Sequence, residues 1–334
     1  MKKTYYLFNP GRLSRKDNTL MFSPTGEEGQ ELTPKYLPVE GIDNLYIFGS
    51  LDANSSLFNF LGKHSISVHF FDYYEHYTGS FYPKEYLLAG KMQVCQTQHY
   101  LLAAKRMILA RKFVEGAAFN IIKNLRYYHN RGKELDLHIA DIEKYVSSVP
   151  AANSISELMG LEGNVRQTYY DAFNYILKDH DMPGRSKQPP MNPVNTLISF
   201  GNMMCYTLCL DMIYHTQLNP TISFLHEPGT RRYSLALDLA EIFKPLLVDR
   251  TIFRVLNKKE VQEKDFSMEM NRCVLKESGK KAFVQAFEER LKETITHRSL
   301  NRQVSYKHLV KLECYKLSKH ILDMEEYKPF KAWW

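Results

Sequence analysis

Cysteine and tryptophan are both scarce in this sequence, and the cysteines form no recognised motif. Five cysteines, at positions 95, 205, 209, 273 and 314, and two tryptophans occur among 334 residues. The absence of a CxxC pair argues against a structural zinc site, and the absence of a secretory segment at the N-terminus favours a reducing cytoplasm. Cys205 and Cys209, four residues apart on an expected apolar helix, are predicted to be core thiols rather than metal ligands.

Long hydrophobic runs are also missing. The most apolar stretch, residues 197–214, still contains Asn202 and Asp211. A membrane helix requires about 20 predominantly apolar residues in succession. We therefore expect a buried helix of a globular protein at this stretch, and no membrane partner.

Positive charge is in excess, and it is unevenly distributed along the chain. The sequence has 44 lysines and arginines against 37 acids, a formal net charge of +7. Residues 1–85 contain eight basic and ten acidic side chains, so the remaining residues carry a net charge of +9. A positive field of this kind attracts polyanions, although a soluble domain with a basic surface has the same composition.

The pattern of apolar residues changes near residue 86. Before it, short β-prone runs separated by turns occur at 4–8, 19–22, 44–48, 66–71 and 77–83, with one short helix expected at 52–63. After it, helical periods occur at 96–126, 136–149, 154–177, 192–216, 234–256, 283–296 and 305–324. We predict an α+β protein with a small β-rich N-terminal domain, residues 1–86, and a larger all-α catalytic domain, residues 87–334.

Glu162 is the first candidate for chemistry because it lies on a helix stripe that should face the core. Val165, Tyr169 and Phe173 follow it at +3, +7 and +11. A carboxylate on such a stripe is costly unless a metal ion or a charged partner compensates it. The alternative to a metal site is a buried ion pair with Arg166, one turn further on.

Three more polar residues follow in the last third of the chain. His226 comes after the Asn219-Pro220 turn, where a lone histidine is often a core or loop residue. Further along, a predicted helix presents Asp238 and Glu241 one turn apart at the border of its apolar stripe. Two such carboxylates repel unless a cation compensates them, and a solvated acidic edge is the alternative.

Together, a glutamate, a histidine and two neighbouring carboxylates are a ligand set for a hard divalent ion that acts on a phosphodiester. Oxygen ligands favour Mg²⁺, and an imidazole ligand shifts the preference toward Mn²⁺. We therefore predict a catalytic group with Mg²⁺ or Mn²⁺ as its cofactor, made of Glu162, His226, Asp238 and Glu241.

Several ordered segments resemble a known family. LMGLEGNVRQTYYDAF at 158–173, NPVNTLISFGN at 192–202 and ISFLHEPGTRRYSLALDLAEIFKPLLVDR at 222–250 look like the signature blocks of the CRISPR-associated integrase of spacer acquisition, the "Cas-one" family. The opening YLFNPGRLSRKDNTLMF and the block NKKEVQEKDFSM are also similar to it. Glu227 and Asn202 depart from the family's usual residues, and neither departure removes a ligand.

The resemblance implies a metal-dependent DNA endonuclease and integrase. Such an enzyme inserts short foreign DNA fragments as new spacers into a CRISPR array, by attack of a DNA 3′-hydroxyl on a phosphodiester. The family's metal ligands fall on Glu162, His226 and Glu241, and Asp238 matches an additional acidic position, where it orients a metal-bound water or holds a second ion. The implied partners are double-stranded DNA fragments, CRISPR repeat DNA, a second copy of the chain and the small "Cas-two" protein, with the β-rich domain serving dimerisation.

DNA contacts are expected from basic side chains near the site and from basic rows on two helices. Arginines near the histidine can neutralise the charge that develops on the reacting phosphate. Basic rows can clamp phosphates without reading the base sequence, although a solvated helix face has the same pattern. The predicted contacts are Lys105, Lys112, Arg166, Arg231, Arg232, Lys307 and Lys311.

Two competing functions have distinct signatures. A non-catalytic DNA-binding scaffold of the adaptation complex would keep the fold and lose an acidic ligand, and no such ligand is lost in this sequence. A metal phosphodiesterase that acts on nucleotides would need no long basic rows.

Overall fold

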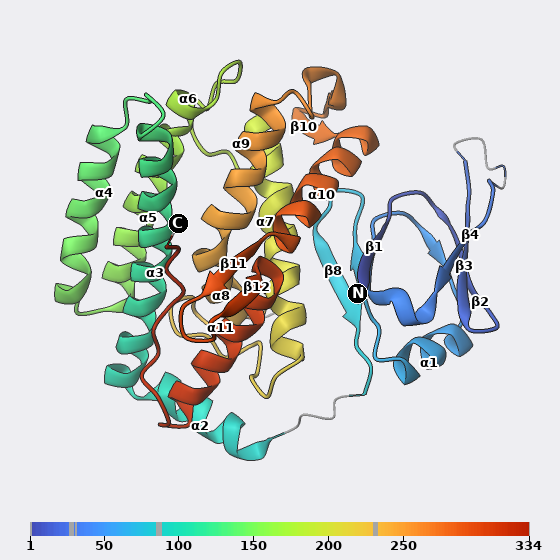
Figure 1. The fold of residues 1–334 in the computed structure, drawn as a ribbon, viewed down its shortest axis with the longest axis horizontal. Coiled ribbons are helices and arrows are strands. Elements are labelled where there is room, and N and C mark those ends of the chain that lie inside the picture. Colours follow the sequence, from blue (N-terminus) through green and yellow to red (C-terminus); the bar gives the residue numbers. More distant parts are fainter. Residues whose placement is uncertain (1, 27–29, 31, 85–88, 230–232, 334) are drawn as a thin grey trace. The chain divides into compact units, whose positions relative to one another are not determined.

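The computed structural model describes residues 2–26, 30, 32–84, 89–229 and 233–333. The chain divides into two compact units, Met1–Leu88 and Ala89–Trp334, where the sequence pattern places the division after residue 86. Unit 1 is rich in strands and unit 2 is mostly helical (Figure 1). The α+β fold class predicted from the sequence is confirmed.

Within its described residues, unit 1 contains two four-stranded sheets, one α-helix and a short 3₁₀ helix at Val39–Gly41. The first sheet has the order β1-β5-β7-β8, and only its β7–β8 pair is antiparallel. The second has the order β4-β3-β2-β6. Alternate residues of β3 are buried, as in a strand with one face on a core. The elements are β1 (Lys3–Leu7), β2 (Gly11–Lys16), β3 (Thr19–Pro24), β4 (Lys35–Pro38), β5 (Ile42–Ile47), β6 (Leu51–Asp52), α1 (Ser55–Lys63), β7 (Ser67–Phe71) and β8 (Tyr77–Phe81).

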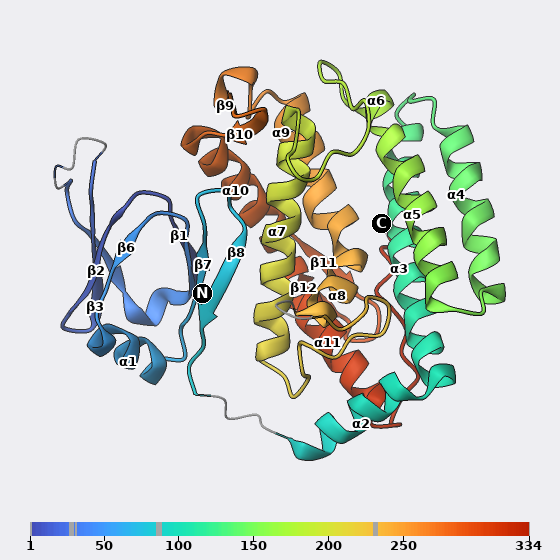
Figure 2. The same cartoon turned by 180° about the vertical axis from the view of Figure 1, so that it is seen from behind.

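Unit 2 is built from helices, which Figures 1 and 2 show from opposite sides. Its helices are α2 (Gly90–Leu101), α3 (Ala103–His129), α4 (Asp136–Ser148), α5 (Ile155–Asp171), α6 (Phe173–Ile176), α7 (Pro193–Tyr214), α8 (Ser234–Lys244), α9 (Arg250–Asn257), α10 (Glu277–Lys292) and α11 (Tyr306–Ile321). The helical run expected at 96–126 is interrupted by Leu102, whose backbone is extended. Helix α7 begins with an N-cap, because the Asn192 side chain accepts a hydrogen bond from the Asn195 backbone N–H.

The core of unit 2 surrounds α8, which packs against both α7 and α3. Its predicted apolar stripe is fully buried, at Leu235, Leu239, Ile242 and Leu246. Helix α7 is long and apolar enough to span a membrane by length and composition, and 83% of its most apolar window is buried within the protein. This burial agrees with the expectation of a buried helix at this stretch, and both Cys205 and Cys209 lie in the core.

The helix expected at 234–256 is broken at its proline. After α8 ends at Lys244, residues Pro245–Asp249 form a π-helical turn, and α9 begins at Arg250. Proline lacks the N–H that would continue the α-helical ladder, so a break at this residue follows from its chemistry. The wider π turn itself is not predicted by the sequence pattern.

Unit 2 also contains two short hairpins that the sequence pattern does not predict. They pair β9 (Phe266–Glu269) with β10 (Arg272–Leu275), and β11 (Thr294–His297) with β12 (Arg302–Ser305). Both have residues with positive φ at their turns, Met270 and Asn271 in the first and Asn301 in the second. The helix expected at 283–296 therefore ends at Lys292, and its last residues belong to β11.

Candidate active site

Asp238 organises the loop that carries His226. Its Oδ2 accepts hydrogen bonds from the backbone N–H groups of Phe224 and Leu225, at 2.7 and 3.0 Å. Its Oδ1 accepts the His226 backbone N–H at 2.9 Å, and the Asp238 side chain is fully buried. A buried carboxylate is stabilised by several N–H donors of this kind. Asp238 thus fixes three successive residues of the loop.

The same carboxylate determines which nitrogen of His226 is available. His226 Nδ1 lies 2.8 Å from Asp238 Oδ1. Since a carboxylate only accepts, Nδ1 carries the proton, and the neutral ring keeps its lone pair on Nε2. Burial lowers the pKa of His226, but the hydrogen bond and negative charge of Asp238 and the charge of Glu241 outweigh it, so the pKa is raised.

Two further side chains, Gln96 of α2 and Arg106 of α3, also hold this loop in place, and neither was identified from the sequence. The Gln96 side chain donates to the carbonyls of Asn219 and Ile222 and accepts the Asn219 N–H at 2.9 Å. Arg106 Nε donates to the Phe224 carbonyl at 2.9 Å. Gln96 is fully buried, and a buried polar side chain of this kind is expected to be hydrogen-bonded.

Glu162 and Glu241 come from different helices and share one guanidinium. Arg166 Nε lies 3.3 Å from Glu162 Oε1, and Arg166 Nη2 donates to Glu241 Oε2. Lys244 forms a second ion pair with Glu241. The Glu162 side chain keeps 18% of its surface exposed and Glu241 only 8%. The ion pair with Arg166, weighed in the sequence as the alternative to a metal site, is present. The solvated acidic edge considered for Asp238 and Glu241 is not found, because both side chains are buried.

Glu241 is held in its ionised form by the cations around it. Burial raises its pKa, but the positive charges of Lys244, Arg166 and His226 together lower it well below its usual range. Glu241 is therefore an anion at neutral pH, held in a low-dielectric setting by cations. Figure 1 shows that α5 and α8, which carry these carboxylates, belong to the same helical unit.

The donor set fits a divalent ion in its chemistry, although the side chains are arranged around protein cations. Among the described residues, no group of three or more histidine, cysteine, aspartate or glutamate side chains lies close enough together to hold a metal. Arg166 occupies the position between the two carboxylates that a shared cation requires. Two carboxylates and one imidazole nitrogen are ligands that Mg²⁺ and Mn²⁺ accept.

Asp249 is a buried acid close enough to this cluster for Arg166 and Lys244 to influence its pKa. Burial raises its pKa to about 7, although the charge of Arg166, a hydrogen bond from Tyr169 and the charge of Lys244 act in the opposite direction. Its Oδ2 atom has no hydrogen-bond partner among the described residues. Tyr169, which the sequence places on the same core-facing stripe as Glu162, is fully buried.

The predicted DNA contacts lie in several different settings. Lys105 pairs with Asp323 at 3.4 Å, and Lys112 pairs with Glu115 at 3.5 Å and with Glu326 at 3.9 Å, so acids balance this row of α3. Arg166 is mostly buried within the acidic cluster. Lys311 Nζ lies 6.0 Å from the centre of the Tyr315 ring, on the same helix as Lys307. Arg231 and Arg232 lie outside the described residues.

Comparisons with known proteins agree with one another. A family model described as "CRISPR associated protein Cas1" matches residues 5–289. The CRISPR-associated endonuclease Cas1 of Fusobacterium nucleatum is 48% identical over 335 residues, which span 100% of this chain and 98% of that protein. A CRISPR-associated endonuclease Cas1 of Thermodesulfovibrio yellowstonii is also 48% identical, over 99% of this chain and 100% of that protein.

Solved structures give the same result for the fold. A CAS1 protein from Thermotoga maritima is similar with a TM-score of 0.86 and 37% identity, over 97% of this chain and 98% of that one. A casposase bound to integration product has a TM-score of 0.89 at 21% identity, over 99% of this chain and 94% of that one. At 21% identity, the likeness to the casposase shows a shared fold alone.

Proposed function

The chain belongs to the CRISPR-associated Cas1 family, a family of nucleases and integrases, and we propose that it is a metal-dependent DNA endonuclease and integrase of spacer acquisition. The reaction is attack of a DNA 3′-hydroxyl on a phosphodiester of the CRISPR repeat, and water in place of the hydroxyl gives nuclease activity. One observation carries the proposal: carboxylates of α5 and α8 share a single cation, Arg166, beside a histidine whose Nδ1 is fixed by Asp238.

We assign the metal-binding role to Glu162, Glu241 and His226 Nε2. A bound Mg²⁺ or Mn²⁺ would act as a Lewis acid on the scissile phosphate. Arg166 pairs with both carboxylates, so a bound ion would take its place at one or both of them. A carboxylate that exchanges one cation for another keeps its charge compensated throughout, so this exchange avoids the cost of a bare buried anion.

Asp238 acts through His226 rather than on the reacting atoms. Its two oxygens already accept four hydrogen bonds, three from backbone and one from the imidazole. We therefore revise the sequence expectation that Asp238 orients a metal-bound water or holds a second ion. Its proposed role is to keep the proton on Nδ1, so that Nε2 could serve as a neutral ligand.

We assign to the cations of the cluster, Arg166 and Lys244, a role toward the DNA phosphate. Once released from Glu162, the Arg166 guanidinium can donate two parallel hydrogen bonds to phosphate oxygens, the geometry in which arginine binds phosphate best. Lys244 stays with Glu241 and limits the negative charge that an approaching DNA phosphate meets. Both effects lower the electrostatic cost of bringing a polyanion to a site made of acids.

The proposed partners are double-stranded DNA fragments, CRISPR repeat DNA, a second copy of this chain and the small Cas2 protein. Solved structures with the fold of this chain include a Cas6-RT-Cas1–Cas2 complex, with a TM-score of 0.82 at 18% identity, and a casposase bound to integration product. The excess of positive charge after residue 85 supports a polyanionic partner. We assign dimerisation to the β-rich unit.

The test is integration of a short duplex into a supercoiled plasmid that carries a CRISPR repeat, with Cas2 added. Wild-type protein is compared with Glu162→Gln and with a matched control on the same helix, Asp171→Asn, whose carboxylate accepts a hydrogen bond from Gln167 on the same helix. We expect EDTA or Glu162→Gln to abolish product and Asp171→Asn to retain it. Product that survives both EDTA and Glu162→Gln would reject the mechanism.

A non-catalytic DNA-binding scaffold is the second candidate. The ion pairs of Arg166 and Lys244 with the two carboxylates favour it, because a purely structural network would have the same contacts. A scaffold predicts tight duplex binding with no metal-dependent product, in wild type and in Glu162→Gln alike. The same assay, with duplex affinity measured beside it, therefore separates the two candidates.

A further inference from the structure

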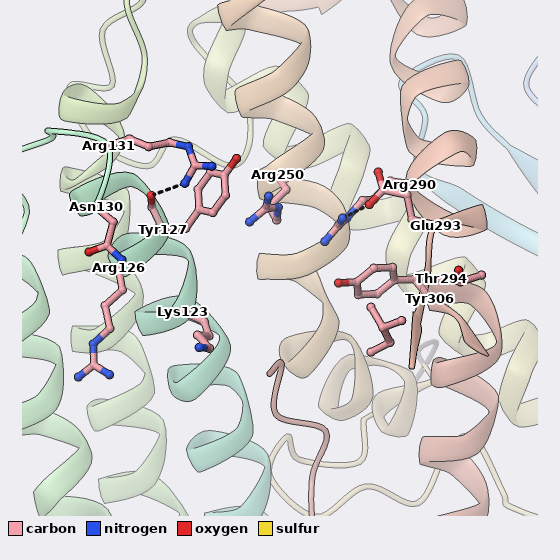
Figure 3. A pocket seen from close by; sticks show the side chains of 11 residues that line it. Lys123, Arg126, Tyr127, Asn130, Arg131, Arg250, Arg290, Glu293, Thr294 and Tyr306 are labelled. Atoms are coloured by element: carbon pink, nitrogen blue, oxygen red, sulfur yellow. Dashed lines mark hydrogen bonds and ion pairs between the residues drawn. The ribbon is translucent and has the colours of Figure 1, made fainter. Parts of the chain in front are cut away.

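Unit 2 contains a second charged site, a basic pocket that the acidic cluster does not use. The pocket has a volume of about 580 Å³ and lies between the end of α3 and the elements α9, α10, β11 and α11. Figure 3 shows Lys123, Arg126 and Arg131 on one side of it and Arg250 and Arg290 on the other. Five cations thus line the pocket together with one carboxylate, that of Glu293, and one of the five, Arg126, also pairs with Glu143 at 2.5 Å.

The spacing of the α3 residues explains why they share a face. Counted from Lys123, the pocket residues at the end of α3 and in the turn after it lie three, four, seven and eight positions further on. They are Arg126, Tyr127, Asn130 and Arg131, and this spacing is that of one side of a helix. This spacing is a signal that the sequence analysis did not use. Like charges at such intervals repel, so the arrangement costs stability unless an anion is bound between them.

Aromatic rings hold the guanidinium groups in place. The Arg131 and Arg250 guanidinium carbons lie 3.7 and 4.3 Å from the centre of the Tyr127 ring. The Arg290 guanidinium lies 4.1 Å from the Tyr306 ring centre. Cations stacked on rings keep their N–H edges directed outward and lose less freedom when they bind an anion. The pocket is therefore organised before any ligand arrives.

Part of this donor capacity is unused. Arg290 donates from Nε to the Leu246 carbonyl at 2.9 Å and from Nη1 to Glu293, but its buried Nη2 has no hydrogen-bond partner within the described part of the chain. The Arg290 side chain is only 11% exposed. Among the described residues, the Lys123 ammonium forms neither an ion pair nor a hydrogen bond. A buried donor without an acceptor is costly, and the Lys123 ammonium on the pocket lining can donate to a ligand rich in acceptors.

The pocket is distinct from the candidate active site. Neighbouring residues of the same elements point to the two sites: Asn124 bonds Tyr169 beside the acidic cluster, whereas Lys123 lines the pocket. Likewise Asp249 is influenced by Arg166 and Tyr169, whereas Arg250 lines the pocket. Since adjacent helical residues point about 100° apart, α3 and the start of α9 form a wall between the sites.

We infer that this pocket binds a ligand with several adjacent phosphate groups. Arginine matches phosphate by paired hydrogen bonds, and the pocket volume lies in the range of small-molecule sites rather than that of a single anion. Two sources have this chemistry: consecutive phosphodiesters of a nucleic acid strand, and the oligophosphate of a free nucleotide. The inference does not depend on the proposed catalysis.

The test measures binding in EDTA, where the proposed metal-dependent reactions do not run. Tripolyphosphate is titrated by calorimetry, and a fluorescein-labelled single-stranded oligonucleotide by anisotropy. The pocket variant is Lys123→Gln with Arg131→Gln. The matched control, Lys144→Gln with Lys258→Gln, removes the same charge from exposed positions outside the pocket. Melting temperatures confirm folding, and Lys123→Glu alone replaces the double variant if the latter unfolds.

We expect the pocket variant to lower affinity for at least one of the two probes by about tenfold or more, with the control within about twofold of wild type. Loss for the oligonucleotide alone identifies a nucleic acid strand as the ligand. Loss for tripolyphosphate alone identifies a free nucleotide. Equal affinities of pocket and control variants for both probes would overturn the inference, even if the integration assay succeeded.

Discussion

At the scale of single residues, Asp238 links the loop of His226 to the core of α8. It is fully buried, and its four hydrogen bonds set both the backbone of the loop and the tautomer of the imidazole. A carboxylate that accepts from several N–H groups is replaced poorly by an amide, because the amide NH₂ faces donors and leaves them unpaired.

Asp238→Asn is therefore expected to lower integration activity by about 10- to 100-fold and stability by about 1–3 kcal/mol. If Asp238 acts through the imidazole, adding Asp238→Asn to His226→Ala should cost little further activity, although stability still falls. Single-turnover integration and urea unfolding of the four proteins measure both effects. Fully additive losses of activity would show that Asp238 acts independently of His226.

Asp249 predicts a pH dependence of stability. Burial, acting against the positive charges around it, raises its pKa from 3.8 to about 7. Between these values the folded chain keeps the proton and the unfolded chain releases it, so the free energy of unfolding falls as pH rises from about 4 to 7. The full shift corresponds to roughly 4 kcal/mol.

Asp249→Asn removes this titration. Relative to wild type, the variant should gain stability steadily as the pH increases through that window, because only the wild-type chain must bury a charge at the upper end. Urea unfolding across a pH series measures the difference. Curves for wild type and variant that stay parallel would contradict the raised pKa.

Some of the ion pairs between single residues could be predicted from the sequence, and others could not. The Glu162–Arg166 pair follows from a spacing of four residues on one helix, and the structure contains it. The pair of Arg166 with Glu241 joins helices 75 positions apart, and only tertiary packing brings them together. Lys105 and Lys112 do share a face, but their pairing with acids of the C-terminal segment has no local sequence signal.

At the scale of elements, glycines of α7 and α5 differ in what surrounds them. A Cβ on Gly201 of α7 would lie 2.4 Å from Val248 Cγ1 and 2.9 Å from Phe283 Cζ, so this glycine allows the π turn and α10 to approach. A Cβ on Gly160 of α5 would meet nothing within 4 Å. The same substitution should therefore have opposite effects at the two positions.

Gly201→Ala is expected to reduce stability by about 1–3 kcal/mol through overpacking, which exceeds the gain in helix propensity. Gly160→Ala should raise stability by about 0.5–1 kcal/mol, because alanine favours the helix and no neighbour is displaced. Thermal and urea unfolding of both variants test this contrast. A Gly201→Ala protein at least as stable as wild type would show that α7 and the π turn are not closely packed.

Some secondary-structure elements could be predicted from the periodicity of apolar residues, and others could not. The apolar stripe of α8 is a local feature and is found as predicted, whereas the break at Pro245 divides the helix expected over 234–256. The hairpins β9–β10 and β11–β12 are not, because four-residue strands are too short for an alternating pattern to stand out from a helical one. Their turns depend on positive φ at Met270, Asn271 and Asn301.

At the scale of the whole molecule, both the family and the uneven distribution of charge can be read from the sequence. The sequence resemblance to the CRISPR-associated integrase family is confirmed by a family model that covers residues 5–289 and by relatives at 48% identity. The excess positive charge lies after residue 85, where the acidic cluster and the basic pocket also lie. The sequence pattern singles out the residues of the acidic cluster as a candidate site but not the pocket, because the pocket is assembled from five separate elements.

Duplex affinity should consequently depend steeply on salt. Raising salt from about 50 to about 200 mM should weaken binding to a duplex of unrelated sequence by at least about tenfold, because phosphate contacts release condensed counterions. Anisotropy titrations at several salt concentrations give the slope of log affinity against log salt. An affinity that does not change over this range would contradict binding through phosphate contacts.

Binding of Mn²⁺ to the full-length protein, followed by the electron paramagnetic resonance signal of the free ion, tests the central claim most directly. Wild type and Asp171→Asn should bind the ion equally, while Glu162→Gln and Glu241→Gln should each weaken binding by about tenfold or more. Equal Mn²⁺ affinity in all four proteins would show that the carboxylates joined by Arg166 are structural ion pairs and not the ligands of a catalytic metal.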